Sequence, residues 1–201
     1  MNLSSKTLRT VLAPLMIFLG LSFVALAALS SSMQAAPLQA AAVADTTEAA
    51  PAAAPEIGLL NARQPMEGLL TGGQITQEQM KAAAAAGYRT IINLRGPGEA
   101  GTWDEAALAE QLGLEYIEIP IASAADLTED NARRLAKALE ETEGEPTVVH
   151  CGSGNRVGAL LALKAYHVDG KSAEEALEIG AEGGMTRLRG TVEEYLATHE
   201  P

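Results

Sequence analysis

The sequence predicts an α/β fold in which a mostly parallel central sheet is flanked by helices. Three observations predict it: short apolar runs rich in β-branched residues, helix-capping motifs that alternate with those runs, and glycines or prolines between them. Alternating strands and helices imply βαβ crossovers, which place helices on both faces of a parallel sheet. The chain has 201 residues. Since its first several dozen are not typical of a globular core, we expect one domain of ordinary size.

The N-terminus predicts an export signal. Lys6 and Arg9 precede a long apolar run at 11–29, which is the charge-then-apolar order of a secretory signal and is long enough to span a bilayer if uncleaved. Residues 1–30 are therefore a signal peptide or a membrane anchor. Residues 31–56 are rich in Ala, Pro and Ser and predict a flexible linker. We expect a periplasmic protein, or one anchored in the inner membrane with its domain in the periplasm.

Residues 57–201 form the predicted domain, and its first half contains alternating helices and strands. A Thr with Gln or Glu three residues later forms a capping box, glycine ends a helix, and β-branched apolar runs form buried strands. In chain order these rules predict a helix from the Thr76-x-x-Gln79 box to about Gly87, a strand at Thr90–Leu94, a helix from the Thr102-x-x-Glu105 box to Gly113, and a strand at Leu114–Ile119.

The same rules apply to the second half. Here they predict a helix from about Thr128 to Glu141, a turn at Gly144–Pro146, a strand that ends at Cys151, a helix over Val157–Tyr166, and two helices that begin at the boxes Ser172-x-x-Glu175 and Thr191-x-x-Glu194.

The strand that ends at Cys151 enters the loop Gly152-Ser153-Gly154-Asn155-Arg156 just before a helix. Backbone N–H groups and the helix dipole at such a place favour a thiolate, which is the nucleophilic form of cysteine. Gly152 and Gly154 allow the positive-φ turns of an anion-binding nest, and Arg156 offers a planar fork for two oxygens. In open α/β sheets ligands bind beyond the carboxyl ends of the strands, where Cys151 is expected.

This loop resembles that of the cysteine-dependent phosphatases of the protein tyrosine and dual-specificity superfamily, especially the bacterial branch labelled beta-lactamase-hydrolase-like. The resemblance spans about Leu69–Leu188 and rests on His150–Arg156, with support from Leu70–Gln74 and Thr90–Arg95. It implies a cysteine phosphatase-like fold and a hydrolase in which Cys151 attacks a phosphate monoester. It also implies that His150 orients the loop and does not act as a general base.

Two departures from that pattern leave alternatives open. Four residues separate Cys151 from Arg156, where the superfamily has five, and four is the spacing of many rhodanese-type sulfurtransferases. Val157 stands where the phosphatases usually carry Ser or Thr. The sequence therefore allows a phosphatase that acts through a cysteinyl-phosphate, a sulfurtransferase that carries a persulfide on Cys151, or a non-catalytic oxyanion-binding module.

Other side chains are candidates for supporting roles. Asp126 is the candidate general acid that would protonate the leaving oxygen, although it also suits the entry to the following helix. Ser153 and Asn155 are candidates for substrate binding, or else simply form the turn. Arg95 and Glu99 flank Gly-Pro-Gly and predict either a structural salt bridge or a contact at the pocket rim.

Charge and composition limit the partners. The formal net charge is −12, from 14 Lys and Arg against 26 Asp and Glu, which disfavours nucleic acid and anionic membranes as binding partners. We expect a compact phosphorylated substrate held in a locally positive pocket, with the segment 11–29 as the candidate membrane tether. His167 and His199 lie far from Cys151 and from clustered carboxylates, so the sequence predicts no metal site. It also predicts no cofactor and a monomeric protein.

Overall fold

A computed structural model describes residues 56–99 and 103–200 of the chain. The predicted signal or anchor and all of the predicted linker before Glu56 lie outside these residues. The strands form one five-stranded sheet with the order β1-β2-β5-β3-β4. Only the edge pair β1 and β2 is antiparallel, and every other pair is parallel. The strands are β1 (Arg63–Met66), β2 (Leu69–Gly72), β3 (Thr90–Asn93), β4 (Glu115–Glu118) and β5 (Thr147–His150).

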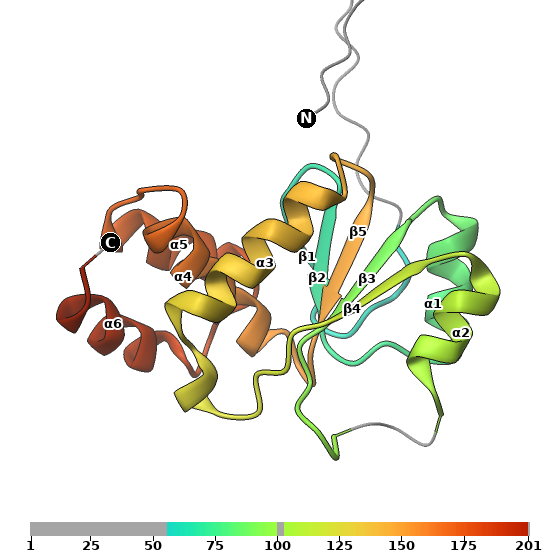
Figure 1. Cartoon of the computed structure of the whole chain (residues 1–201), viewed down its shortest axis with the longest axis horizontal. Helices are drawn as coiled ribbons and strands as arrows, with labels where there is room; N and C mark the ends of the chain where they lie inside the picture. Colours follow the sequence, from blue (N-terminus) through green and yellow to red (C-terminus); the bar gives the residue numbers. More distant parts are fainter. Residues whose placement is uncertain (1–55, 100–102, 201) are drawn as a thin grey trace, which may run out of the picture. The chain divides into compact units, whose positions relative to one another are not determined.

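Helices cover both faces of this sheet, with α1 and α2 on one face and α3 to α6 on the other (Figure 1). Along β3, Ile91 packs with the α1 and α2 side and Ile92 with the opposite side, as the two-residue period of a strand requires. The helices are α1 (Gln77–Ala85), α2 (Glu105–Leu112), the short 3-10 helix η1 (Ala124–Asp126), α3 (Glu129–Glu141), α4 (Asn155–His167), α5 (Ala173–Glu182) and α6 (Arg189–Thr198).

The predicted α/β fold is confirmed as a mixed sheet flanked by helices. The hairpin of β1 and β2 was not predicted as strands. β1 is mostly exposed and contains a proline, so it lacks the alternating apolar pattern of a strand. β2 is fully buried, but it ends in glycine and has only four residues. Such a short run is not distinguishable from a loop by periodicity alone.

Two predicted helix starts are wrong. Asp104, and not Thr102, caps α2, and Glu105 is the first residue of that helix, with its carboxylate turned into the protein; Thr102 itself lies outside the described residues. Helix α6 begins after Leu188, with Thr191 inside its first turn. The side chain of Asn155 accepts the backbone N–H of Leu188 at 3.3 Å, so a residue of another helix fixes this start.

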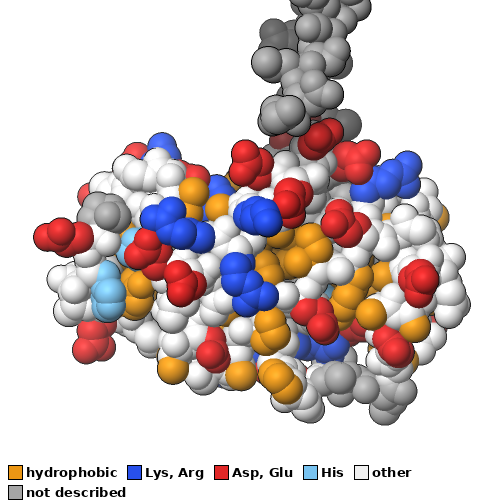
Figure 2. Space-filling view, viewed as in Figure 1, with side chains coloured by type: hydrophobic (Ala, Val, Ile, Leu, Met, Phe, Trp, Pro, Cys, Tyr) orange, Lys and Arg blue, Asp and Glu red, His pale blue; other side chains and the backbone are white. Residues whose placement is uncertain are grey.

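The boxes at Thr76 and Ser172 are confirmed at the starts of α1 and α5. Among the helices of the described residues, none combines the length and the hydropathy that a bilayer crossing requires. On the face that Figure 2 presents, Lys and Arg side chains lie interspersed with Asp and Glu and are not gathered in a stripe.

Candidate active site

The centre of the sheet carries the cysteine. β5 lies between β2 and β3, and Cys151 is the first residue after it. The Cys151 N–H donates to the carbonyl of Gly72 at 3.2 Å, and the His150 carbonyl accepts the N–H of Leu94 at 2.8 Å. Neighbouring strands thus hold the end of β5 from both sides. The Cys151 side chain has no solvent exposure.

The loop after Cys151 folds back over the sulfur. Its Sγ accepts the N–H of Gly154 at 3.1 Å, and Gly154 is the N-cap of α4. Gly154 has φ of +87°, a left-handed backbone conformation that favours glycine. The sulfur therefore lies at the positive end of a 13-residue helix, as the sequence predicts.

Arg156 reaches across the carboxyl end of the sheet to the loops after β3 and β4. Its Nη1 and Nη2 donate to the two carboxylate oxygens of Glu99 at 2.6 and 2.5 Å. Nη1 also donates to the Ile121 carbonyl at 2.7 Å. The hydrogen bonds with Glu99 hold the pKa of Arg156 above its ordinary value, with a smaller contribution from the nearby Cys151 sulfur. The same hydrogen bonds lower the pKa of Glu99.

One edge of the Arg156 guanidinium remains open. An arginine has five N–H donors, and Glu99 and Ile121 together take both of Nη1 and one of Nη2. The second N–H of Nη2 and that of Nε form the remaining fork, and the Cys151 sulfur is close enough to Arg156 to raise its pKa. Nη2 also lies beside the loop, since a Cβ on Gly152 would be 3.3 Å from it. Arg156 can therefore keep Glu99 on one edge while it binds an oxyanion over the loop on the other.

A buried polar cluster lies beside His150, the residue that precedes Cys151. Arg95 and Glu105 form an ion pair whose side chains are each 3% exposed. The other Glu105 oxygen accepts the Tyr116 hydroxyl at 3.2 Å and lies 3.2 Å from Nε2 of His150. That last contact has an ion-pair distance without hydrogen-bond alignment, since neither nitrogen of the His150 ring has an aligned partner. Burial raises the pKa of Tyr116 well above its ordinary value.

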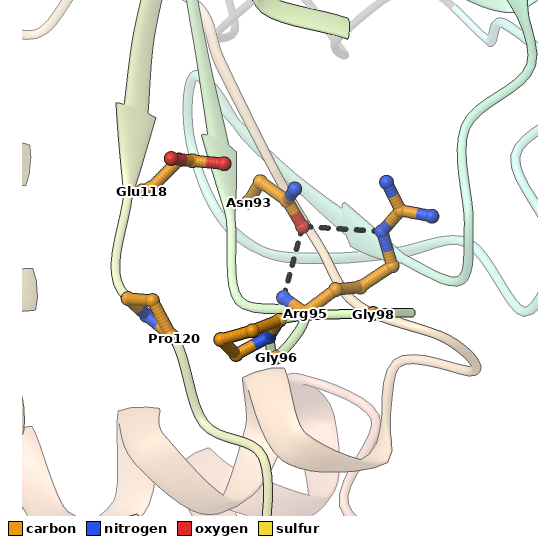
Figure 3. Close-up of a pocket in the computed structure, with 7 residues that line it drawn as sticks. Asn93, Arg95, Gly96, Gly98, Glu118 and Pro120 are labelled. Carbon is orange, nitrogen blue, oxygen red and sulfur yellow. Dashed lines mark hydrogen bonds between the residues drawn. The ribbon is translucent and has the colours of Figure 1, made fainter. Parts of the chain in front are cut away.

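A pocket of about 220 Å³ lies beside this cluster at the ends of β3 and β4. Figure 3 shows Asn93 between Glu118 and the Arg95 side chain, and the Asn93 side-chain oxygen accepts the Arg95 backbone N–H at 2.9 Å. Of the two alternatives for Arg95 and Glu99, the salt bridge is not formed, since Arg95 binds the backbone carbonyl of Glu99 and pairs with Glu105. Arg95 does line this pocket, as the other alternative predicts. Glu105 is a site residue that the sequence does not reveal, because its position there is that of a capping residue.

The remaining candidates each bind another segment of the chain. The hydrogen bonds of the Asp126 carboxylate go to the backbone and hydroxyl of Ser123, in a capping box of η1. The Asn155 side-chain oxygen accepts N–H groups of Thr186 and Leu188 and so binds the segment before α6. Ser153 pairs with Gly73 at the end of β2. Within 56–99 and 103–200, no three His, Cys, Asp or Glu side chains are grouped to hold a metal ion.

Three features together define the cysteine phosphatase class of fold. They are a cysteine after a central parallel strand, a loop that returns the Gly154 N–H to its sulfur, and an arginine in the first turn of the next helix. Solved structures share this fold. A DUF442 protein of Shewanella putrefaciens CN-32 superposes with a TM-score of 0.53 at 17% identity, over 72% of this chain and 96% of its own. The core catalytic domain of the PP-IP phosphatase SIW14 of S. cerevisiae gives 0.55 at 10% identity, over 71% and 86%.

The family itself follows from the sequence comparison. Residues 58–195 match the family described as "DSP-PTPase phosphatase fused to NAD+ Kinase", and the chain belongs to this family. It is also 35% identical over 116 residues, 56% of its length, to beta-lactamase hydrolase-like proteins of two Xylella fastidiosa strains, Temecula1 and 9a5c. The matched part spans 26% of the length of those relatives. The family match confirms the resemblance drawn from the loop, and the solved structures share the fold.

Proposed function

We propose that this protein hydrolyses a compact phosphate monoester through a cysteinyl-phosphate on Cys151. The observation that carries the proposal is the position of the Cys151 sulfur, which accepts the Gly154 N–H at 3.1 Å at the start of α4. The open edge of Arg156 lies beside the same loop. A nucleophile, a helix N-terminus and a bidentate cation thus converge where a phosphoryl group would develop negative charge.

The proposed reaction has two steps. The Cys151 thiolate attacks phosphorus, an S–P bond forms, and the P–O bond to the leaving alcohol breaks. Water then attacks the phosphorus, the S–P bond breaks, and inorganic phosphate leaves while the thiolate is restored. Arg156 and the loop N–H groups bind the phosphoryl oxygens in both steps.

The leaving oxygen needs a proton unless it is a stable anion such as a nitrophenolate. Asp126 is the candidate donor, and its carboxylate is held by Ser123. We therefore expect activated aryl phosphates to be the best substrates, with only a modest loss of turnover in Asp126→Asn. Vigorous hydrolysis of unactivated alkyl phosphates that depends strongly on Asp126 would contradict this part of the proposal.

Parallel assays separate this function from its main rival. The purified domain is given 4-nitrophenyl phosphate in one assay and thiosulfate with cyanide in the other, each with Cys151→Ser as the control. The proposal expects release of nitrophenolate that depends on Cys151. Thiocyanate formation without phosphate-ester hydrolysis would assign sulfurtransfer instead, and neither activity would leave an oxyanion-binding module.

We also propose that the protein is exported and acts in the periplasm, either free or tethered by residues 11–29. The supporting observation is the order of Lys6, Arg9 and the apolar run, which lies outside the described residues. Fractionation of cells that express the full chain tests it. Recovery of the protein only in the cytoplasmic fraction would contradict export. We further propose a monomer without nucleic-acid partners, given the net charge of −12.

A further inference from the structure

A second pocket opens on the other side of the cysteine loop. It has a volume of about 300 Å³ and is lined by Asn61, Arg63, Ser153, Gly184, Thr186 and Arg187. We name it the arginine pocket. Its lining offers two guanidinium groups, two hydroxyls and an amide, and it contains no carboxylate. This is the composition of a site for an anion with several oxygens, such as a phosphate group.

The two arginines lack acidic partners. Arg156, Arg133 and Arg189 each pair with a glutamate, whereas no described carboxylate forms an ion pair with Arg63 or Arg187. The hydrogen bond of the Arg63 side chain goes to the neighbouring carbonyl of Ala62 at 2.9 Å. Two like charges in one pocket repel each other, and a bound anion relieves that repulsion. In a chain with a net charge of −12, two unpaired arginines in one pocket are a specific feature and not part of a general basic surface.

The fold holds both arginine-bearing segments against the cysteine loop. Asn155, four residues after Cys151, accepts the N–H of Thr186 at 2.7 Å and that of Leu188 at 3.3 Å, so both neighbours of Arg187 are tied to the first residue of α4. On the other side, the Thr71 hydroxyl donates to the Gly183 carbonyl at 3.1 Å and lies 3.4 Å from the Arg63 carbonyl. The arginine pocket is therefore positioned by the elements that position Cys151.

Ser153 belongs to both sites. It lines the arginine pocket, its carbonyl accepts the Asn61 amide at 3.0 Å, and it is two residues from Cys151. Two trans peptide steps place its Cα at most about 7.6 Å from that of Cys151. A small molecule can therefore occupy both sites at once.

We propose that the arginine pocket binds a second phosphate group of the substrate, so that the preferred substrate class is a small molecule with two phosphates on a short linker. This rests on the proposed function, because the first phosphate is the one that Cys151 attacks. Arg63 and Arg187 bind the phosphate that is not cleaved, and they hold the molecule in place while the ester phosphate lies over the cysteine loop.

Inhibition of 4-nitrophenyl phosphate hydrolysis tests the proposal with two matched probes, butyl phosphate and 1,4-butanediol bisphosphate. In the parent protein we expect the bisphosphate to inhibit at a concentration at least tenfold lower. In Arg63→Gln/Arg187→Gln the two probes should differ by no more than about twofold, the statistical advantage of a molecule with two ends. Hydrolysis of 4-nitrophenyl phosphate itself should stay within twofold of the parent, since this ester has one phosphate.

Arg189→Gln is the control, because it removes an arginine two residues from Arg187 that pairs with Glu193 outside the pocket. The Arg189→Gln variant should keep the full preference for the bisphosphate over butyl phosphate. Both pocket arginines are exposed. If the double variant does not fold, the single variants Arg63→Gln and Arg187→Gln replace it. Each single variant should lose part of the preference for the bisphosphate. A parent without preference, or a preference that survives loss of both arginines, would overturn the proposal.

Calorimetric titration with the same two probes separates the two proposals. If the parent does not hydrolyse 4-nitrophenyl phosphate, the proposed function fails, yet tighter binding of the bisphosphate that is lost with both arginines still supports the pocket. If hydrolysis is present and the two probes bind with equal affinity, the function stands and the arginine pocket does not bind a second phosphate.

Discussion

The carboxylate of Glu99 holds the end of the Arg156 guanidinium with both of its oxygens, across 57 residues of sequence. The side chains are 37% and 17% exposed, so the pair lies at the rim of the site and is partly screened by water. The pair therefore contributes more to the orientation of the Arg156 guanidinium than to the free energy of folding. It sets the plane of the guanidinium and leaves the edge with Nε open towards the loop.

The first prediction concerns Glu99. In Glu99→Gln the charged partner is lost and the guanidinium is less firmly held, so we expect kcat/KM for an aryl phosphate to fall about tenfold, mainly in kcat, or about 1.4 kcal/mol of transition-state stabilisation. Steady-state kinetics measures this. Glu129→Gln, which breaks the exposed pair with Arg133, is the control and should leave kinetics unchanged. Higher activity in Glu99→Gln would mean that Glu99 competes with the substrate for Arg156.

The second prediction concerns the fork of Arg156. Lysine keeps the charge but offers no planar pair of donors, so Arg156→Lys should lose about 2–4 kcal/mol of transition-state stabilisation, comparable to the loss of an oxyanion donor. Circular dichroism and a thermal melt should show a folded protein, because the partners of Arg156 lie at the rim. Nearly normal turnover in a folded variant would show that bidentate binding at this position does not drive the reaction.

The third prediction concerns the close approach of α4 and α5. A Cβ at Gly158 would lie 2.2 Å from the Met185 nitrogen and 2.3 Å from the Gly180 carbonyl oxygen. Gly158→Ala should therefore destabilise by about 1–3 kcal/mol despite the better helix propensity of alanine. Gly190→Ala in α6, where a Cβ meets nothing within 4 Å, is the matched control and should be neutral or stabilising by up to about 1 kcal/mol. Chemical denaturation measures both, and equal effects would contradict the packing argument.

The fourth prediction concerns pH. Burial lowers the pKa of His167 below its ordinary value of 6.5, and neither ring nitrogen has a hydrogen-bond partner. Between the lowered folded value and 6.5 the unfolded chain binds more protons, so stability is full above about pH 7 and falls as the pH drops through 6.5. His167→Phe keeps an aromatic ring between Tyr166 and Tyr195 and should flatten the dependence of unfolding free energy between pH 7.5 and about 5.5.

His199 is exposed and contributes least to the lowered pKa of His167, so His199→Phe is the comparison variant and should reduce the slope only slightly. A His167→Phe variant whose stability falls with acid as steeply as that of the parent would show that another group carries the dependence.

Local signals explain what the sequence could predict. The strand, loop and helix around Cys151 are contiguous, and glycine positions, an apolar run and the following helix together predict how the sulfur meets α4. The capping boxes at Thr76 and Ser172 act within four residues, and both were predicted.

The contacts that complete the candidate site are not local, and no single-sequence pattern predicts them. Glu99 meets Arg156 only because β3 and β5 are neighbours in the sheet. The Glu105 carboxylate does not take part in a capping box, because it forms an ion pair with the buried Arg95. The arginine pocket combines Arg63, Ser153 and Arg187 from three segments, and the segments of Arg63 and Arg187 carry no strand or helix signal in the sequence.

The proposed function requires that phosphorus becomes bonded to Cys151. The most direct test is to mix the protein with an excess of 4-nitrophenyl phosphate, quench with acid within the first turnovers, and identify the modified peptide by mass spectrometry. We expect one phosphoryl group on the peptide of the parent that contains Cys151, and none in Cys151→Ser. In Arg156→Lys the level of this phosphopeptide should rise only if lysine slows the second step more than the first. Nitrophenolate release at the parental rate from Cys151→Ser, with no phosphoryl group on Cys151 of the parent, would contradict it.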